Sequence, residues 1–310
     1  MENRPDLSVI VVTHNGCDMA ITTLRSAQAS LGDVSAEWLV ADSGSTDGTP
    51  DAIERAFPDV KVFRSGNRGF AAGNNVALPH ARGRYVLLLN PDVEIEHGTL
   101  AELVAALDER IEVGIASVLQ RGSDGRLLPS IRRFPTPARD LGEALGAARV
   151  PLLRRMQELD DEYERYTQER SVDWLVGAFL IARREAVQDV GPMDEGFFLY
   201  SEEIDWCHRF RQHGWDVRHL PFMAVIHHGG DSERPELVAQ LSSSRLRFAY
   251  KHFARPKAVG IHAALMLKHV LRLAALVPAA ALLPRLRRRA RAEASGLAVL
   301  CGGTPPYGGS

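Results

Sequence analysis

Several carboxylates of this sequence come directly after apolar runs, at the points where buried strands would end. Asp42 closes one such run and Asp92 follows another, while Glu202 and Glu203 come after the aromatic segment GFFLY. An aspartate at the carboxyl end of a buried strand can bind a hard divalent cation, and Mg²⁺ is commonly held by one or two carboxylates together with substrate phosphates. A carboxylate beside apolar surface can have the raised basicity of a general base. The sequence therefore offers candidate metal ligands and candidate bases.

Each of these acids also has a structural explanation. Asn-Pro-Asp, which ends at Asp92, is a common turn, and Asp47 can cap a helix that follows Asp42. Acids in the first turn of a helix complement its macrodipole, which would account for the group after GFFLY. The position of Asp92 after a strand, in a chain that also carries Asp42, favours ligand binding over a simple turn.

A second polar group lies in the segment GNRGFAAGNN. Here Asn67, Arg68, Asn74 and Asn75 stand among glycines and alanines, and a bland turn followed by a helix would not need so many side-chain amides. Glycines let a backbone approach a ligand closely. The segment is therefore interpreted as a binding site for a diphosphate or a sugar.

Two histidines, His227 and His228, end a short apolar run before a Gly-Gly turn. A lone histidine is more often structural. An imidazole near a metal-binding aspartate, however, completes a mixed nitrogen and oxygen site that suits Mn²⁺ or Mg²⁺. His227 is the candidate partner of Asp92.

The elements that must position these residues follow from the apolar runs. The first 120 residues alternate short apolar runs with stretches of helix length, which predicts βαβ units and a mainly parallel sheet flanked by helices. Functional residues of such sheets gather at the carboxyl ends of the strands. The expected strands are LSVIVVT, EWLVADS, VKVF, YVLLLN and VGIASVL.

The rest of the chain reads differently. Residues 121–170 combine a Pro-rich stretch with a charged one, as in a long loop and a polar helix or flap. Strand and helix patterns resume up to residue 232, the chain is helical from residue 233 to 300, and residues 301–310 have a composition typical of disorder. We expect a catalytic domain over 1–232, in halves 1–120 and 121–232, and a helical extension over 233–300.

Composition excludes some classes of protein. The 310 residues carry a net charge of −2, with 45% hydrophobic and 25% charged residues, which is ordinary for a soluble protein and argues against a nucleic-acid partner. Three distant cysteines indicate neither a disulfide framework nor a closed zinc site, which fits the cytoplasm. The first apolar run is too short for the core of a signal peptide.

The apolar stretch before residue 284 is close to the length of a membrane span, but Lys268, His269, Arg272 and Pro278 interrupt it. We therefore predict no transmembrane helix here. The mixture of Leu and Ala with a run of arginines fits an interfacial helix attracted to anionic lipid, and it fits equally a helix packed on the catalytic domain with a solvated basic end.

Taken in order, these motifs resemble those of the family 2 glycosyltransferases of the GT-A fold, and most of all their bacterial rhamnosyltransferase-like branch. The resemblance covers about residues 7–232. It implies an inverting, metal-dependent hexosyltransferase that moves a sugar from a nucleoside diphosphate donor to a hydroxyl of a saccharide or polyprenyl-linked acceptor in cell-envelope polysaccharide synthesis. L-rhamnose from dTDP-rhamnose is the first expectation, and a UDP-sugar such as a galactofuranosyl or glucosyl donor is the alternative. The motifs are SVIVVTHNG, DSGSTDGT, NRGFAAGNN, LLLNPDV, VGAFLIARREAVQDVGPMDEGFFLYSEEIDWCHRFRQHGW and VIHHGGDS.

The resemblance also implies roles in donor binding. Asp42 matches the acid that hydrogen-bonds the nucleotide base, and Thr13 and Asn15 match the loop around base and ribose. Arg68 lies in the segment that approaches the donor, and Asn74 belongs to the same amide-rich segment.

Roles in metal binding and catalysis follow in the same way. Asp92 matches the last aspartate of the Asp-x-Asp metal motif, in which Asn90 replaces the first acid, so that one carboxylate of the motif contacts Mg²⁺ or Mn²⁺. His227 matches the histidine of the HxGGxS pattern. Glu203 matches the second acid of the pair that contains the catalytic base, and because this chain has Glu-Glu there, Glu202 is the alternative.

Two other functions are compatible with parts of the pattern. A sugar-nucleotide pyrophosphorylase would need a Gly-rich basic loop after the first strand, where this chain has THNGCDMAITT. A non-catalytic saccharide-binding or scaffold relative would have no need to keep Asp42, Asp92, Glu203 and His227 together. The expected location is the cytoplasm, with peripheral association at the inner face of the cell membrane.

Overall fold

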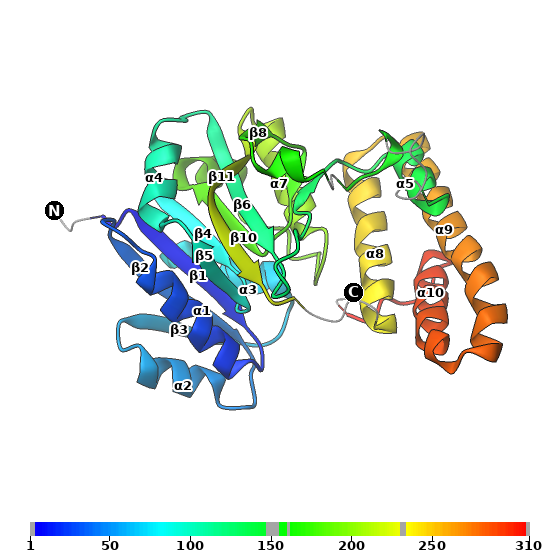
Figure 1. Cartoon of the computed structure of the whole chain (residues 1–310), viewed down its shortest axis with the longest axis horizontal. Helices are drawn as coiled ribbons and strands as arrows, with labels where there is room; N and C mark the ends of the chain where they lie inside the picture. Colours follow the sequence, from blue (N-terminus) through cyan, green and yellow to red (C-terminus); the bar gives the residue numbers. More distant parts are fainter. Residues whose placement is uncertain (1–3, 147–154, 160–161, 230–233, 308–310) are drawn as a thin grey trace. The chain divides into compact units, whose positions relative to one another are not determined.

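The computed structural model describes residues 4–146, 155–159, 162–229 and 234–307 (Figure 1). They belong to two compact units, which are treated separately below. From the sequence we expected one domain boundary near residue 232, a position outside the described residues. In the structure the second unit also includes two segments from earlier in the chain. The first unit comprises Met1–Arg132, Asp160–Glu195 and Glu202–Gly229, and the second comprises Arg133–Leu159, Gly196–Ser201 and Gly230–Ser310.

The first unit is built on a nine-stranded sheet with the order β3-β2-β1-β4-β10-β6-β11-β5, and β8 pairs with β11. A separate two-stranded sheet contains β7 (Ile131–Arg132) and β9 (Trp174–Leu175). The strands of the large sheet are β1 (Leu7–Thr13), β2 (Ala36–Ser43), β3 (Val60–Ser65), β4 (Tyr85–Leu89), β5 (Val93–His97), β6 (Val113–Arg121), β8 (Arg170–Ser171), β10 (Phe179–Arg183) and β11 (Asp216–His227).

Strand direction divides this sheet into a parallel half and a mixed half. β3, β2, β1 and β4 run parallel, β10 is antiparallel to both of its neighbours β4 and β6, and β11 is parallel to β6. Every residue of β1 and β4 is buried, which explains why their sequences are apolar at nearly every position. The expected mainly parallel α/β sheet is confirmed, with the antiparallel strands β10, β5 and β8 added to it.

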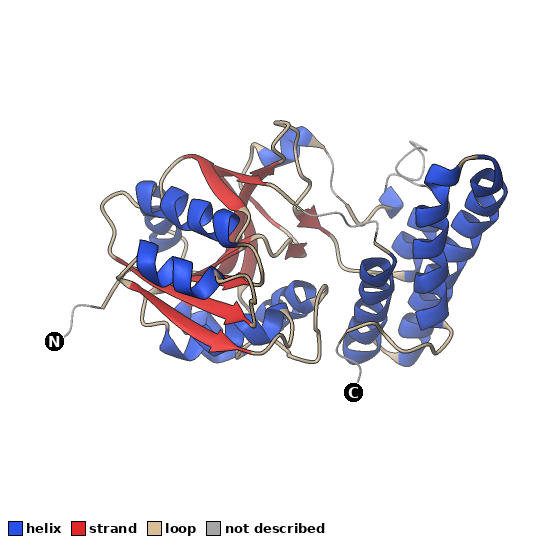
Figure 2. Cartoon of the chain, turned by 90° about the horizontal axis from the view of Figure 1, so that it is seen from below, coloured by secondary structure: helices blue, strands red, loops and turns tan. Residues whose placement is uncertain are grey.

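Helices lie against both faces of the sheet (Figure 2). Helix α4 (Leu100–Asp108), which precedes β6, begins with a capping box: the side chains of Thr99 and Glu102 each accept a hydrogen bond from the backbone N–H of the other residue. The helices of this unit are α1 (Cys17–Ala29), α2 (Thr49–Ala56), α3 (Phe70–Ala77), α4 (Leu100–Asp108), α6 (Arg184–Val190) and α7 (Glu202–Gln212), with short 3₁₀ turns η1 (Leu78–His80) and η4 (Tyr163–Tyr166).

Helix α3 lies so close to the sheet that Gly73 has no room for a side chain. A Cβ there would lie 2.6 Å from Val12 Cγ1 and 3.2 Å from Ser43 Oγ. We expect Gly73→Ala to lower the free energy of unfolding by about 1–3 kcal/mol through overpacking, although alanine favours helix more than glycine does. Urea unfolding measures this. Gly66→Ala is the control, because no atom lies within 4 Å of a Cβ there; equal losses for the two variants would contradict the packing argument.

The second unit is helical. It contains α5 (Pro137–Ala144), α8 (Pro235–His252), α9 (Arg255–Leu282), η5 (Pro284–Leu286) and α10 (Arg287–Leu300). Its apolar core includes Ala249, Ala258, Ile261, Leu265 and Leu300. In the terminal segment that was expected to be disordered, residues 301–307 are described, and the ring of Tyr307 stacks on Phe198 with centroids 5.1 Å apart.

A buried ion cluster joins α8 to the segments before it in this unit. Arg245 Nη2 lies 2.8 Å from Asp140 Oδ1 and also contacts Glu158, and the two carboxylates are almost fully buried. Burial raises the pKa of Asp140 to about 6. The cluster therefore depends on Arg245, because removal of one member of a buried ion pair leaves uncompensated charge.

We expect Arg245→Met to lower the free energy of unfolding by about 3–5 kcal/mol at pH 7.5. Since the folded-state pKa of Asp140 is raised above its usual value, ionisation of this group costs stability as the pH rises through about 6. At pH 5 the carboxyl of Asp140 is protonated, so that loss of Arg245 leaves less uncompensated charge. The difference in free energy of unfolding between the variant and the wild type is therefore smaller at pH 5 than at pH 7.5. Urea unfolding at both values tests this, with the exposed Arg255→Met as control. A loss below about 1 kcal/mol, or one that is independent of pH, would contradict it.

Candidate active site

Thr13, Asp42, Asp92 and His227 lie at or directly after the ends of strands. β1 and β2 are paired in register so that Thr13 is the Cα partner of Asp42, which brings the ends of both strands to the same edge. β4 ends at Leu89, and the next residues form the turn that leads into β5. β5 pairs antiparallel with β11 so that Val93 faces His227 across the ladder. Strand pairing thus places residues that are distant in sequence beside each other.

The first group surrounds Asp42, whose side chain is 2% exposed. Its Oδ1 accepts from the backbone N–H of Ser45 at 3.0 Å, while its buried Oδ2 has no hydrogen-bond partner among the described residues. The buried hydroxyl of Thr13 likewise has none there. Buried polar atoms are normally hydrogen-bonded, so both are suited to a polar ligand.

Asn15 ties the loop after β1 to the loop after β2. It has a φ of 51°, which an asparagine tolerates better than most residues. Its Oδ1 accepts from the N–H of Thr46 at 2.8 Å, and its own N–H donates to Ser45 Oγ at 2.9 Å. This side chain therefore shapes the edge beside Asp42, and its Nδ2 lies 3.3 Å from His14 Nε2.

The second group is Asp92 with His227. Asp92 Oδ1 is 3.4 Å from His227 Nε2, and both side chains are 19% exposed. The turn itself is held by backbone bonds, from the N–H of Asn90 to the carbonyl of Ala178 and from the N–H of His228 to the carbonyl of Asp92, each 2.9 Å. Asp92 Oδ1 makes no hydrogen bond in the described part of the chain. Backbone hydrogen bonds thus hold the turn, and the buried Asp92 Oδ1 lies beside the imidazole of His227.

These two side chains fit a divalent cation that is bound partly by its substrate. Across the residues that the structure describes, three or more His, Cys, Asp or Glu side chains nowhere gather in a way that could hold a metal. Mg²⁺ commonly takes only one or two carboxylates from the protein and completes its shell with phosphates and water. A carboxylate oxygen without a hydrogen bond, facing an imidazole, suits such a site. The neighbouring His228 is engaged elsewhere, since its Nε2 is 2.6 Å from Glu94 Oε1.

The third group opens α7. The Glu202 side chain is 4% exposed, and burial followed by the neighbouring charge of Glu203 raises its pKa well above the usual range. Glu203 is partly exposed. The two residues before them, Tyr200 and Ser201, have φ values of 67° and 68°, which are uncommon for side chains of this size and typical of functional sites. Of the two acids, Glu203 is the more exposed, although its Oε2 is buried.

A glycine that the sequence reading did not single out adjoins this acid. A Cβ at Gly177 would lie 3.6 Å from Glu203 Cβ and 3.8 Å from Phe70 Cε1. A methyl group at this position would therefore make ordinary van der Waals contact with the Phe70 ring and the Glu203 side chain.

The amide-rich segment divides into ligand-facing and structural residues. Asn75 is structural, because its amide bonds the backbone of Met193 in both directions and also reaches Glu195. Arg68 lies on the surface and pairs with Glu195 at 3.0 Å. Asn74 is buried, with Nδ2 donating to the carbonyl of Phe70 and Oδ1 left without a partner in the described residues. The interpretation of all these amides as ligands was therefore too broad.

Comparison with known sequences places the chain in a family. Residues 8–191 match the family described as Glycosyl transferase family 2. The N-acetylglucosaminyl-diphospho-decaprenol L-rhamnosyltransferase of Mycobacterium tuberculosis (strain CDC 1551 / Oshkosh) is 32% identical over 222 residues, which are 66% of this chain and 70% of that protein. Rhamnosyltransferase WbbL of Escherichia coli (strain K12) is 24% identical over 209 residues, 65% of this chain and 76% of that protein.

A solved structure gives the same answer for the fold. The mannosyltransferase PcManGT from Pyrobaculum calidifontis, in complex with GDP-Man and Mn²⁺, superimposes with a TM-score of 0.59 at 19% identity, over 97% of this chain and 87% of that one. The fold is GT-A. From the family match, the relatives and this fold together, the chain belongs to glycosyltransferase family 2.

Proposed function

We propose that this protein transfers a sugar from a nucleoside diphosphate donor to an acceptor hydroxyl, with inversion at the anomeric carbon and with Mn²⁺ or Mg²⁺ as cofactor. The observation that carries the proposal is the pair Asp92 and His227, 3.4 Å apart beside a sheet edge that also ends in the buried Asp42. We infer that this edge binds the nucleotide base at Asp42 and, through the cation, the diphosphate at Asp92 and His227.

Donor binding begins at Asp42. Its buried Oδ2, which has no hydrogen-bond partner in the part of the chain that the structure describes, would accept a hydrogen bond from an N–H of the nucleotide base. Such a bond would satisfy an atom that is otherwise costly to bury. Thr13 and Asn15 would line the base and ribose. Asn74 and the exposed Arg68 would approach the sugar diphosphate.

Asp92 and His227 would hold the cation. A bound Mn²⁺ or Mg²⁺ supplies Lewis-acid stabilisation of the departing diphosphate. The contribution of the protein is to hold the carboxylate in place through the backbone bonds of the turn after β4.

Glu203 would act as the general base that takes the proton of the attacking hydroxyl. Its partial exposure allows an acceptor to approach, whereas Glu202 is buried, with a raised pKa that favours the neutral carboxylic acid. One base and no covalent sugar intermediate give inversion, by the logic that separates inverting from retaining glycosidases.

L-rhamnose from dTDP-rhamnose is the proposed donor, because two of the relatives are named rhamnosyltransferases. A polyprenyl-linked saccharide is the proposed acceptor, since the mycobacterial relative is named for a diphospho-decaprenol substrate. The reaction would then belong to cell-envelope polysaccharide synthesis at the inner face of the membrane. A UDP-sugar is the second candidate donor, and TarS from S. aureus, a solved relative in fold, has been seen in complex with UDP.

A panel of dTDP-, UDP- and GDP-sugars tests this proposal, with Mn²⁺ or Mg²⁺ present and then removed by EDTA. We expect dTDP-rhamnose with metal to raise the melting temperature and to release dTDP slowly, because bound ligand stabilises the folded state. Asp42→Ala should abolish the shift. Stabilisation by UDP-sugars alone would move the assignment to that class. An absence of nucleotide release from every donor would favour a non-catalytic saccharide-binding relative.

A further inference from the structure

Helix α9 has an exposed apolar face, which we name the α9 face. Its large members are all more than a third exposed. At 100° per residue they fall within an arc of about 120° on the helix, and the alanines at 263 and 274 fall within the same arc. Charged residues are absent from that arc. The large members are Val259, Leu267, Val270, Leu271 and Val277.

The opposite side of α9 belongs to the core of the helical unit. Ala258, Ile261 and Leu265 are buried there. The same side carries polar groups with partners inside the unit: His269 Nδ1 is 2.6 Å from Glu293 Oε2, and Lys268 Nζ is 3.8 Å from Glu143 Oε2. The helix therefore has one face committed to the protein and one face without a partner among the described residues.

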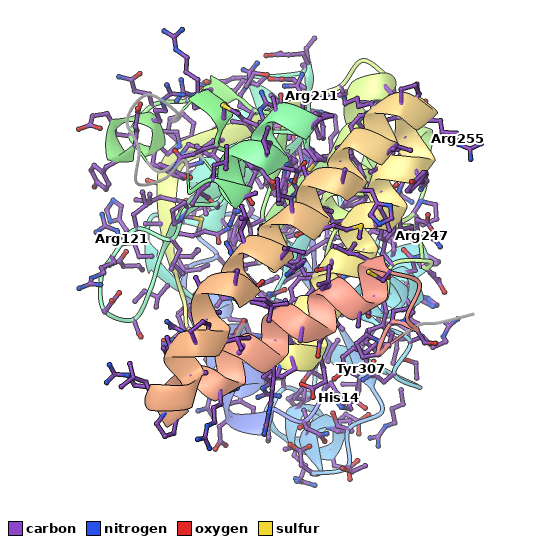
Figure 3. The ribbon with its side chains drawn as sticks, turned by 90° about the vertical axis from the view of Figure 1, so that its right-hand side faces the viewer. His14, Arg121, Arg211, Arg247, Arg255 and Tyr307 are labelled. Carbon is purple, nitrogen blue, oxygen red and sulfur yellow. The ribbon has the colours of Figure 1, made fainter. Side chains whose placement is uncertain are left out.

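The charge of α9 and α10 is predominantly positive. Residues 255–300 contain nine Arg and Lys and a single acidic residue, Glu293, in a chain whose net charge is −2. Figure 3 shows α9 and α10 side by side, with Arg255 pointing outward at the start of α9. Beyond the end of α9, Arg285, Arg287 and Arg291 are exposed. An apolar face bordered by cations complements a surface whose interior is apolar and whose boundary is anionic.

We propose that the α9 face docks peripherally on an anionic lipid bilayer, with α9 in the plane of the interface and the arginines that follow it among the lipid phosphates. The proposal rests on the proposed function in one respect, because a polyprenyl-linked acceptor is found at such a surface. It deepens that function by naming the surface that brings the enzyme to its substrate.

A transmembrane helix is the first competing arrangement. By length and composition, Arg255–Ala280 is apolar enough to cross a membrane. As a span, however, α9 would expose Lys268 and His269 to hydrocarbon and would break the bond from His269 to Glu293. His269 is buried inside the helical unit, with its Nε2 3.0 Å from Ser242 Oγ, and the Lys268 side chain is 15% exposed beside Glu143. Both observations favour a helix that lies on the membrane.

A second copy of the chain is the other competing occupant. Two α9 faces packed together would bring two segments with an excess of eight positive charges into proximity. Repulsion between like charges opposes that association. An anionic lipid surface gains from the same charges.

Vesicle co-sedimentation of the full-length protein tests the proposal. We expect binding to vesicles of phosphatidylcholine with 30% phosphatidylglycerol, at least tenfold weaker binding to phosphatidylcholine alone, and release by 0.5 M NaCl or by a carbonate wash. Val270→Glu combined with Val277→Glu should weaken binding at least tenfold, and Arg285→Gln with Arg287→Gln and Arg291→Gln should remove the preference for anionic lipid. Ile111→Glu, at a position 75% exposed in the other unit, is the matched control and should bind as wild type does.

Three results would overturn the proposal: equal binding by the α9-face variant and wild type, retention after the carbonate wash, or a concentration-dependent dimer that the α9-face substitutions dissolve. Circular dichroism checks that the variants fold. Release of dTDP from dTDP-rhamnose in solution should be unchanged by all of them, so a failure to bind vesicles is distinguishable from a failure of the catalytic proposal.

Discussion

Glu203→Gln is expected to lower kcat for sugar transfer by about 10²- to 10⁴-fold, the usual contribution of a general base. Glutamine keeps the shape of the side chain and cannot accept the proton of the acceptor hydroxyl. Donor binding should change little, because Asp42 and Asp92 are untouched. The result would appear as a loss in kcat with a similar KM for the donor.

The neighbouring acid supplies a matched control for this prediction. Glu202 is buried, and its raised pKa favours the neutral form, which glutamine imitates. Glu202→Gln should therefore cost less than about tenfold in kcat, well below the loss expected for a base. If Glu202→Gln were the damaging change and Glu203→Gln the mild one, the two roles would have to be exchanged.

Asp92→Asn is expected to lower kcat/KM by about 10²- to 10³-fold, because the metal contributes several kcal/mol of charge stabilisation in the transition state. Asparagine can keep the turn, since the bond that this residue makes to the N–H of His228 uses the backbone carbonyl. The substitution weakens cation binding, so the loss should shrink at high Mn²⁺ concentration. Donor-induced thermal stabilisation should lose its dependence on metal at ordinary concentrations.

Two further substitutions test the same metal assignment, one at the second proposed ligand and one at a neighbouring control position. His227→Ala should show the same dependence on Mn²⁺ with a smaller loss, because Asp92 keeps the charge. Glu94→Gln should behave as wild type, since Glu94 is engaged with His228 beside the pair. An Asp92→Asn variant that is fully active with EDTA present would rule out the metal assignment.

Strands could be predicted from the sequence where the local residue pattern alone indicates burial. β1, β2, β4 and β6 were expected because their apolar runs are nearly continuous, and such runs indicate burial on both faces. β3 was expected from the shorter run VKVF, and only Val60 of this strand is buried. β5 was missed, since VEIEH alternates over only five residues after a turn. The direction of β10, antiparallel to its neighbours, depends on tertiary contacts that no local pattern encodes.

The same distinction applies to the candidate site. The grouping of Thr13 with Asp42 was expected from parallel strands that end together. The proximity of Asp92 to His227 follows from the pairing of β5 with β11, which the sequence does not reveal. The expectation that they share a metal came from the chemistry of the two residue types and from the family resemblance. The difference between Glu202 and Glu203 is a difference in burial, and the roles of Asn75 and Gly177 depend on long-range contacts.

The most direct test of the central claim is the anomeric configuration of the product. The full-length protein would be incubated with dTDP-rhamnose, Mn²⁺ and a short prenyl-diphospho-N-acetylglucosamine, and the new linkage would be assigned by NMR. A single displacement assisted by Glu203 predicts a configuration inverted from that of the donor, at a rate that Glu203→Gln reduces at least 100-fold. A product with the donor configuration retained would contradict the account.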